Sequence, residues 1–324
     1  MYPLERSRRL RKSAVLRDLV RETRLSANDF LVPLFVVEGE KIREAIPSMP
    51  DYNRLSLDEL EKEAKLLWSM GLKVVLLFVK VDDHLKDNAG TEALNPNGLM
   101  QRAIQTVKAA VPEMVVFTDV ALDPYSSFGH DGIVENNRIL NDATNEVLAQ
   151  MSLSHAQAGA DVVAPSDMMD GRVKSIRQEL EKQGFVDTCI MSYSAKYASG
   201  FYGPFRDALD SAPGFGDKKT YQMDPGNRLE ALKEVRQDVE EGADIVMVKP
   251  GLAYLDIVRE VTQTAEVPVA VYQVSGEYAM LKAAAEKGWL DYETVMMEQL
   301  MAFKRAGASL IATYCAKDAI ALLS

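Results

Sequence analysis

Two lysine residues carry the most reactive chemistry that the sequence suggests. Lys196 follows the apolar run 189–195, and Lys249 follows the apolar run 244–248. If these runs are neighbouring parallel strands, about 4.8 Å apart, the two amines meet in one space and each lowers the pKa of the other. A neutral amine attacks a carbonyl to form a Schiff base. One lysine at a strand end is more typical of phosphate or carboxylate binding, whereas a pair on adjacent strands favours Schiff-base chemistry.

The runs that lead into these lysines belong to a larger pattern of short apolar segments. We expect eight strands that are buried on both faces, as in a parallel sheet. They cover residues 31–37, 73–79, 114–120, 161–165, 189–195, 244–248, 267–274 and 309–314. Helical periodicity lies between them, for example in residues 227–241, where apolar residues recur every three or four positions. Ser56 and Glu59 predict a capping box at the start of another helix.

Four glycines mark junctions between the expected helices and strands. Gly71, Gly159, Gly242 and Gly307 each stand between a helical pattern and an apolar run. A glycine at such a position can adopt the left-handed conformation that ends a helix. Eight strands alternating with helices predict an α/β fold, a (β/α)8 TIM barrel, with a doubly wound sheet as the alternative.

Two segments exceed the needs of a minimal barrel. Residues 1–30 are largely polar and precede the first strand, so we expect an extended N-terminal arm. Residues 199–227 are rich in glycine and proline but also carry five aromatic residues, which argues against disorder. We therefore predict a long lid over an active site, within a single catalytic barrel domain of residues 31–324.

Composition argues against several classes of protein. The chain has 37 basic and 48 acidic residues, a net charge of −11, which argues against nucleic acid as a partner. Cys189 and Cys315 form neither a disulfide framework nor a CxxC zinc site, and this usage is typical of a reducing compartment. The apolar runs are shorter than the ~20 residues of a membrane span, and no signal-peptide run follows the basic N-terminus. We expect a cytoplasmic protein without a membrane partner.

Longer motifs around the two lysines carry a family resemblance. They are SAKYAS at 194–199, FYGPFR at 201–206, MVKP at 247–250, PSDMMDGR at 165–172, VSGEY at 274–278, TY at 313–314 and RRLR at 8–11. From about residue 6 to the C-terminus, in order and at similar spacing, the chain closely resembles the porphobilinogen synthase family, also called 5-aminolevulinate dehydratase. Several of these strings are long enough that a chance match is implausible.

The resemblance implies a hydro-lyase of tetrapyrrole biosynthesis, the route to haem and chlorophyll. Two molecules of 5-aminolevulinate condense asymmetrically, lose two waters and give the pyrrole porphobilinogen. Both substrates are ketones, which explains why two amine nucleophiles are useful. By position, Lys249 binds the substrate that supplies the propionate side, and Lys196 binds the substrate that supplies the acetate side.

The same resemblance assigns residues to the two substrate carboxylates. Arg206 and Lys218, both in the predicted lid, match the cationic pair for the acetate-side carboxylate, where a guanidinium gives a bidentate grip. Ser275 and Tyr314 match the hydroxyl pair for the other carboxylate, and Gln222 assists inside the lid. Without the resemblance, these residues would be interpreted as exposed charges or as hydroxyls at the edge of the core.

The metal chemistry implied by the resemblance depends on three positions. Zinc-dependent members carry cysteines where this chain has Ala121, Asp123 and Asp131. Alanine binds no metal, and carboxylates are hard donors suited to Mg²⁺ or K⁺ rather than to a thiolate zinc cage. The chain therefore resembles the zinc-independent, aspartate-rich, magnesium-stimulated branch, with Asp123 and Asp131 as candidate ligands for Mg²⁺ or a monovalent cation. Alternatively, Asp119 and Asp131 act as acid–base groups or orient a substrate amine.

An allosteric magnesium site and an oligomer also follow from the resemblance. The family's second magnesium site matches Glu234, and Mg²⁺ tolerates a single carboxylate because it keeps several waters. In the family the N-terminal arm wraps a neighbouring barrel, and dimers assemble into homo-octamers. Arg9 or Arg11 would then reach a partner subunit near this site. Taken alone, Glu234 would be a solvated helix residue.

Two other functions stay open at this point. A Schiff-base aldolase on the same barrel needs one nucleophilic lysine and usually a phosphate site, so the second lysine counts against it. A non-catalytic barrel that binds or assembles would leave both lysines unreactive. The sequence contains no P-loop, HExxH or GxSxG motif, which argues against the chemistries that depend on them.

Overall fold

The computed structural model describes residues 1–209 and 214–323 and confirms the predicted barrel. Within these residues, eight parallel strands close into a ring because the last strand pairs with the first, so the doubly wound alternative is wrong. In ring order the strands are β1 (Phe30–Val36), β4 (Val74–Val79), β5 (Val115–Val120), β8 (Val162–Pro165), β9 (Cys189–Lys196), β10 (Ile245–Lys249), β11 (Val269–Tyr272) and β12 (Leu310–Ala312). Each strand begins and ends within two residues of its prediction.

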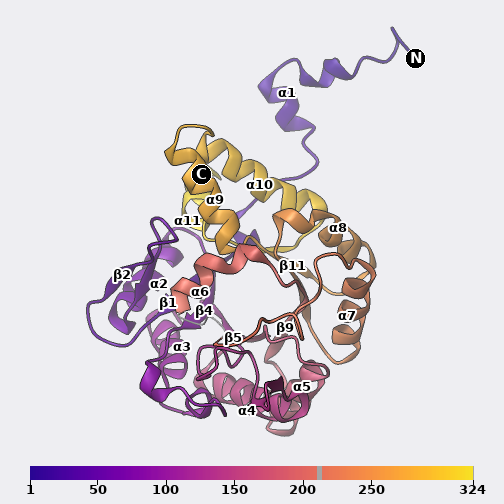
Figure 1. Cartoon of the computed structure of the whole chain (residues 1–324). Helices are drawn as coiled ribbons and strands as arrows, with labels where there is room; N and C mark the ends of the chain where they lie inside the picture. Colours follow the sequence, from indigo (N-terminus) through magenta and orange to yellow (C-terminus); the bar gives the residue numbers. More distant parts are fainter. Residues whose placement is uncertain (210–213, 324) are drawn as a thin grey trace.

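Helices surround the ring of strands (Figure 1). They are α2 (Leu57–Ser69), α3 (Leu99–Ala110), α4 (Asn141–Ala158), α5 (Arg172–Lys182), α7 (Leu229–Glu240), α8 (Leu255–Thr264), α9 (Ser275–Glu286), α10 (Tyr292–Ala306) and α11 (Ala316–Leu323). The four junction glycines, Gly71, Gly159, Gly242 and Gly307, all have positive φ, between 91° and 115°. This confirms that each glycine ends a helix in the left-handed conformation before a strand begins.

The predicted capping box at the start of α2 is wrong, although Ser56 is the N-cap residue. The Ser56 hydroxyl accepts from the backbone N–H of Ile42 at 2.9 Å and donates to Asp58 at 2.6 Å. Glu59 instead binds Arg43 at 3.2 Å. The hairpin of β2 (Arg43–Ala45) and β3 (Asn53–Leu55) lies alongside, and its long-range groups displace the local cap that the sequence pattern favours.

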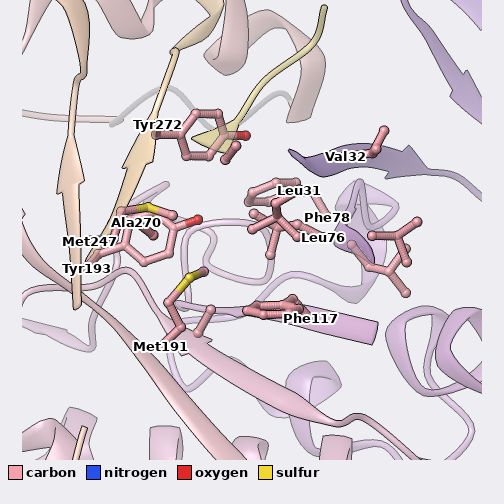
Figure 2. Packing of buried hydrophobic residues seen from close by; sticks show 14 of the residues in the cluster. Leu31, Val32, Leu76, Phe78, Phe117, Met191, Tyr193, Met247, Ala270 and Tyr272 are labelled. Atoms are coloured by element: carbon pink, nitrogen blue, oxygen red, sulfur yellow. The ribbon is translucent and has the colours of Figure 1, made fainter. Parts of the chain in front are cut away.

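Side chains pack the barrel interior, as Figure 2 shows. The labelled interior residues Leu31, Leu76, Phe117, Met191 and Met247 are buried. Because a filled interior makes the barrel a packed core rather than a pore, chemistry is left to the strand ends and to the loops that follow them.

The arm and the lid extend beyond this barrel. The arm carries η1 (Ser7–Arg11) and α1 (Ala14–Leu19), is largely exposed as far as residue 24, and projects away from the ring of helices (Figure 1). The lid contains η5 (Gly200–Tyr202) and α6 (Gly203–Leu209), a helix that the sequence pattern did not predict. Residues 210–213 of the predicted lid lie outside the described residues.

Shorter elements complete the chain. They are η2 (Ala27–Asp29), η3 (Asp83–Leu85), η4 (Thr91–Leu94), η6 (Leu252–Tyr254) and the hairpin β6 (Val134–Glu135) and β7 (Arg138–Ile139). Across the part of the chain that the structure describes, none of the helices is long and apolar enough to cross a membrane.

Candidate active site

Lys196 and Lys249 lie side by side at the carboxyl ends of the neighbouring strands β9 and β10. The two residues are register partners in the parallel pairing of these strands. Their exposed fractions are 7% and 5%, so both amines are buried. Both lysines line one cavity, together with Asp123, Tyr202, Phe205, Arg206, Lys218 and Gln222. The structure therefore brings the two predicted nucleophiles to one place.

The cavity around the lysines is small. Its free volume is about 30 Å³, which leaves room for only a few water molecules. Lid residues from both described parts of the lid, Phe205 and Arg206 on one side and Lys218 and Gln222 on the other, contribute to its lining. Two substrate molecules thus need the lid to move before they can reach the lysines.

Four aromatic rings surround the ammonium group of Lys249. The rings are those of Tyr193, Tyr202, Phe205 and Tyr272, with centroids 5.0, 5.3, 4.9 and 4.6 Å from Nζ. Burial lowers the pKa of Lys249 to about 7, and the positive charge of Lys196 acts in the same direction. A substantial fraction of this amine is therefore neutral near pH 7, as nucleophilic attack requires.

Lys196 has polar surroundings instead. Its ammonium group donates a hydrogen bond to the carbonyl oxygen of Ser166 and lies 3.5 Å from Oδ2 of Asp131. The Ser166 hydroxyl in turn donates to Oδ1 of Asp119 at 2.7 Å. One chain of contacts thus connects β9, β8 and β5 at the same end of the barrel.

Asp119 is a buried carboxyl at the end of β5. Burial raises its pKa to about 7, and the charge of Asp123 adds to the shift, while the Ser166 hydrogen bond and the two lysines oppose it. A carboxyl that titrates near neutral pH can both accept and release a proton. This behaviour suits the acid–base role that the sequence suggested for Asp119.

Lys218 lies between the two aspartates that were candidate metal ligands. Its Nζ is 2.6 Å from Oδ1 of Asp131 and 3.2 Å from Oδ2 of Asp123. Burial alone would lower the pKa of Lys218, but the charges of Asp123 and Asp131 raise it above its ordinary value. Burial would raise the pKa of Asp131, but Lys218 and Lys196 hold it below its ordinary value.

These contacts bear on the fit of a metal at Asp123 and Asp131. An ammonium group already neutralises both carboxylates, and the described residues contain no cluster of three or more metal-ligating side chains. Ala121, the third position of the family's cysteine set, is buried and has no donor atom. The donor set therefore fits a lysine better than a resident metal ion, and we derive no catalytic step from a metal here.

Ser275 and Tyr314 lie one contact away from Lys249 rather than in the lining of its cavity. Ser275 Oγ accepts a hydrogen bond from the backbone N–H of Phe205 at 2.9 Å. The Tyr314 hydroxyl is 3.0 Å from the hydroxyl of Tyr272. Phe205 and Tyr272 are both rings that contact Lys249, so the predicted hydroxyl pair borders the surroundings of this lysine.

Glu234 lies outside the lysine cavity, on α7. This half-buried residue lines a larger open cavity of about 860 Å³, together with Asp170, Asp224 and Gln222. Burial raises the pKa of Glu234. Gln222 lines both cavities, so it lies between the lysine site and the region of Glu234.

Sequence reasoning missed the aromatic surroundings of Lys249. It selected the lid aromatics as a sign of order, but it did not place Tyr202 and Phe205 against the lysine. A usable signal was the presence of Tyr272 inside an otherwise apolar strand, because a buried tyrosine hydroxyl needs a polar partner, here the hydroxyl of Tyr314. Ser166 stands in the motif PSDMMDGR at 165–172, and its bridging contacts became evident only in the fold.

The fold and the site together define a barrel enzyme with two buried lysines beneath a lid. Comparison with known proteins makes this more specific. The family described as delta-aminolevulinic acid dehydratase matches residues 4–322. The chain belongs to this family.

Relatives match over nearly the whole chain. A delta-aminolevulinic acid dehydratase of Synechococcus elongatus is 54% identical over 323 residues, covering 98% of each chain. One of Methanothermus sociabilis is 55% identical over 319 residues, again covering 98% of each chain. The crystal structure of the Toxoplasma gondii ME49 enzyme with its reaction product porphobilinogen has a TM-score of 0.96 and 51% identity. That match covers 98% of this chain and 91% of the other.

Proposed function

We propose that this chain carries out the family's reaction on Lys249 and Lys196. In that reaction two molecules of 5-aminolevulinate condense to porphobilinogen with release of two waters, the activity of a hydro-lyase. The observation that carries the proposal is the register pairing of two buried lysines beneath the lid. A Schiff-base aldolase has a use for one such lysine, whereas two ketone substrates give both lysines a use.

Each lysine acts on one ketone. Nζ attacks the carbonyl carbon, and the carbonyl oxygen leaves as water once protons have been transferred to it, which gives a protonated Schiff base. Both ketone oxygens leave in this way, which accounts for the two waters. One new carbon–carbon bond and one new carbon–nitrogen bond then join the substrates. Both carbon–Nζ bonds break, and the two lysines return as amines.

The two lysines have different parts in this scheme. Lys249 takes the propionate-side substrate first, because its lowered pKa leaves a neutral amine near pH 7 and the four rings keep water away from it. Lys196 takes the acetate-side substrate. Asp119 exchanges protons with the reacting groups, since its pKa of about 7 lies near that of Lys249.

Residues close to each lysine bind the carboxylates of the two substrates. Arg206 and Lys218 hold the acetate-side carboxylate, supported by their place in the cavity lining, with Gln222 beside them. Lys218 must then share its charge between Asp123, Asp131 and the substrate. Ser275 and Tyr314 hold the other carboxylate, and Ser275 keeps its own hydrogen for this purpose because it accepts from Phe205.

We further propose that the enzyme needs no catalytic zinc and is stimulated by Mg²⁺. Ala121 and the Lys218–Asp131 pair support the first statement. For the second, Glu234 is a half-buried carboxylate that lines an open cavity, which suits an ion that keeps most of its waters. Bound there, Mg²⁺ supplies charge that favours one assembly state over another.

The arm supports the proposal of a homo-octamer built from dimers. Residues 1–24 expose apolar side chains, among them Leu10 and Leu19, and carry Arg9 and Arg11. We propose that this arm packs on the barrel of a neighbouring subunit and brings an arginine toward Glu234. We also propose that the enzyme acts in the cytoplasm, which the free thiols of Cys189 and Cys315 support.

Borohydride trapping tests the proposed function. The protein is reduced in the presence of 5-aminolevulinate, and the modified lysine is located by mass spectrometry, while porphobilinogen is measured by its colour reaction. We expect the adduct on Lys249 in the parent and in Lys196→Ala, which should form little product. Lys249→Ala should form essentially no product yet keep its fold. An adduct confined to another lysine, or more than a few per cent of activity in Lys249→Ala, contradicts the assignment.

A further inference from the structure

Arg54 reaches from the barrel rim to the lid. It lies on β3, opposite Phe35 of β1, and only 5% of its surface is exposed. Its Nε donates a hydrogen bond to the carbonyl oxygen of Ala208 at 2.6 Å, and one of its terminal nitrogens donates to the carbonyl oxygen of Asp207. The other terminal nitrogen binds Glu44 at 2.8 Å. All three nitrogens of the guanidinium are thus engaged, two of them by the lid.

The two carbonyls belong to the last turn of α6. Carbonyl groups at a helix C-terminus lack partners within the helix and form the negative end of its dipole. A planar guanidinium can bind two of them at once, which an ammonium group cannot do with the same geometry. Since α6 has seven residues, it is too short to be stable alone, and its contacts at both ends determine where it lies.

The other end of α6 is fixed on α9. The backbone N–H of Phe205 donates to Ser275 Oγ, and the neighbouring Gly276 lies against Phe201. A Cβ atom at position 276 would be 2.4 Å from the carbonyl oxygen of Phe201. The lid helix is therefore held at its beginning by the first residues of α9 and at its end by Arg54.

Residues of α6 face the reaction site. Phe205 places its ring 4.9 Å from Nζ of Lys249, and Arg206 lines the cavity of the two lysines. Any displacement of α6 therefore moves one wall of the aromatic surroundings of Lys249 together with a proposed carboxylate ligand. Arg54 itself does not line this cavity.

We infer that Arg54 is a positioning residue that holds the lid helix α6 closed over the lysines through the carbonyl groups of Asp207 and Ala208. The consequence for catalysis rests on the proposed function, because it assumes that Phe205 and Arg206 act on 5-aminolevulinate. The effect on the lid itself does not depend on the substrate. The effect of Arg54 on the lid helix and its effect on catalysis can therefore be measured separately.

The test compares Arg54→Met, Arg54→Lys and the control Arg43→Met in the full-length protein. Arg43 is on the same hairpin but pairs with Glu59 and Glu63, away from the lid. Hydrogen exchange followed by mass spectrometry reports on residues 203–209. Each lost charged hydrogen bond is expected to speed exchange there by about tenfold or more. Strands β4 and β5 should keep their protection.

Kinetics give the second readout. We expect kcat/KM to fall about tenfold to a hundredfold in Arg54→Met, with a smaller loss in Arg54→Lys. Borohydride trapping on Lys249 at saturating substrate should persist, because the nucleophile is intact. Arg43→Met should match the parent in both readouts.

Three results would overturn the inference. The first is unchanged exchange in residues 203–209 of Arg54→Met. The second is faster exchange spread evenly over the barrel with a lower melting temperature, which would mark Arg54 as a general stabilising residue. The third is an equal effect of Arg43→Met. If the parent forms no porphobilinogen, the proposed function fails, but the exchange comparison still decides whether Arg54 holds α6.

Discussion

Lys249 of β10 and Lys196 of β9 are partners in the strand register and share the ring of Tyr193, yet the rest of their surroundings differ. Aromatic rings enclose the first, while a carbonyl oxygen and the carboxylate of Asp131 contact the second. In the proposed mechanism this difference lets Lys249 react before Lys196. The positive charge of Lys196 also contributes to the lowered pKa of Lys249.

The pH dependence of trapping on Lys249 follows from these contacts. In the parent, the rate of adduct formation should rise through about pH 7 as the amine loses its proton. Lys196→Met removes a positive charge that lowers the pKa of Lys249, so the midpoint should move to higher pH. Asp119→Asn removes a negative charge that raises this pKa, so the midpoint should move to lower pH. Borohydride trapping at a series of pH values, followed by mass spectrometry, measures both shifts.

The exposed lid residue Lys219 provides the control for this experiment. Lys219→Met removes one positive charge at a site that is not buried, and it should leave the midpoint unchanged. If all variants share the parent's midpoint, the charges of Lys196 and Asp119 do not set the reactivity of Lys249.

The lowered pKa of Lys249 also predicts a cost in stability. Between about pH 7 and pH 10.5 the unfolded chain binds a proton that the folded protein lacks, so the free energy of unfolding should fall as pH is lowered through this range. Lys249→Met lacks this dependence and should be more stable than the parent at pH 7, by up to about 4 kcal/mol. Urea unfolding of both proteins at pH 7 and pH 10 measures the difference. A Lys249→Met variant that is less stable than the parent at pH 7 would contradict the lowered pKa of the buried Lys249 amine.

The barrel and its lysines were predictable because their signals are local. Each strand is a short apolar run, and each junction glycine stands in a fixed place between a helix and a strand. Lys196 and Lys249 end such runs, so their convergence follows from the topology of a parallel barrel. The residues proposed to bind the substrate carboxylates were assigned from a family resemblance and not from spacing.

Contacts between distant parts of the chain were not predictable. Lys218 binds Asp123 and Asp131 across 95 and 87 positions, so an ammonium group contacts both aspartates for which the sequence suggested a metal. Arg54 binds the lid across 154 positions. The capping box predicted at Ser56 is wrong for the same reason, since the Ser56 hydroxyl accepts a hydrogen bond from the backbone N–H of Ile42. In each case the partner lies 14 or more positions away, so the local sequence pattern does not indicate it.

Gly276 allows the beginning of the lid to approach α9. In Gly276→Ala the new Cβ would lie 2.8 Å from Cα and 2.4 Å from the carbonyl oxygen of Phe201, and backbone atoms cannot rotate away. We expect the lid to shift at a cost of about 1–3 kcal/mol, with a corresponding loss in kcat/KM. Gly203→Ala is the matched control, because a Cβ there meets no atom within 4 Å. Steady-state kinetics with 5-aminolevulinate measure both variants, and equal kinetics in the two would refute the role of Gly276.

Arg206 and Lys218 should differ when each is neutralised. Arg206→Met removes a proposed carboxylate ligand and should mainly raise KM, with a loss in binding free energy of about 1.5–3 kcal/mol per charged hydrogen bond. Lys218→Met also leaves Asp123 and Asp131 buried without their ammonium partner, so the protein should lose stability and the pKa of Asp131 should rise. Kinetics and thermal unfolding together separate the two effects. Lys219→Met controls for loss of charge in the lid, and an unchanged KM in Arg206→Met would remove that residue from the site.

We expect an activity that is independent of zinc and stimulated by Mg²⁺, because of Ala121, the Lys218–Asp131 pair and Glu234. Zinc chelators should leave activity intact, because the aspartate-rich segment offers an ammonium partner rather than thiolates. Mg²⁺ should stimulate the parent by favouring the larger assembly, since a ligand that binds one assembly state shifts the equilibrium toward it. Tightly bound stoichiometric zinc in active protein would refute the first part.

Glu234→Ala tests the second part against Glu240→Ala, which removes an exposed carboxylate from the same helix. Because the lysines and the lid are untouched, Glu234→Ala should keep a basal activity, lose magnesium stimulation and sediment as smaller oligomers. Sedimentation with and without Mg²⁺ gives a readout independent of turnover, and activity under the same conditions gives the second. Glu240→Ala should behave as the parent does. Equal stimulation of Glu234→Ala and the parent would mean that Glu234 is a half-buried helix residue without a part in binding the ion.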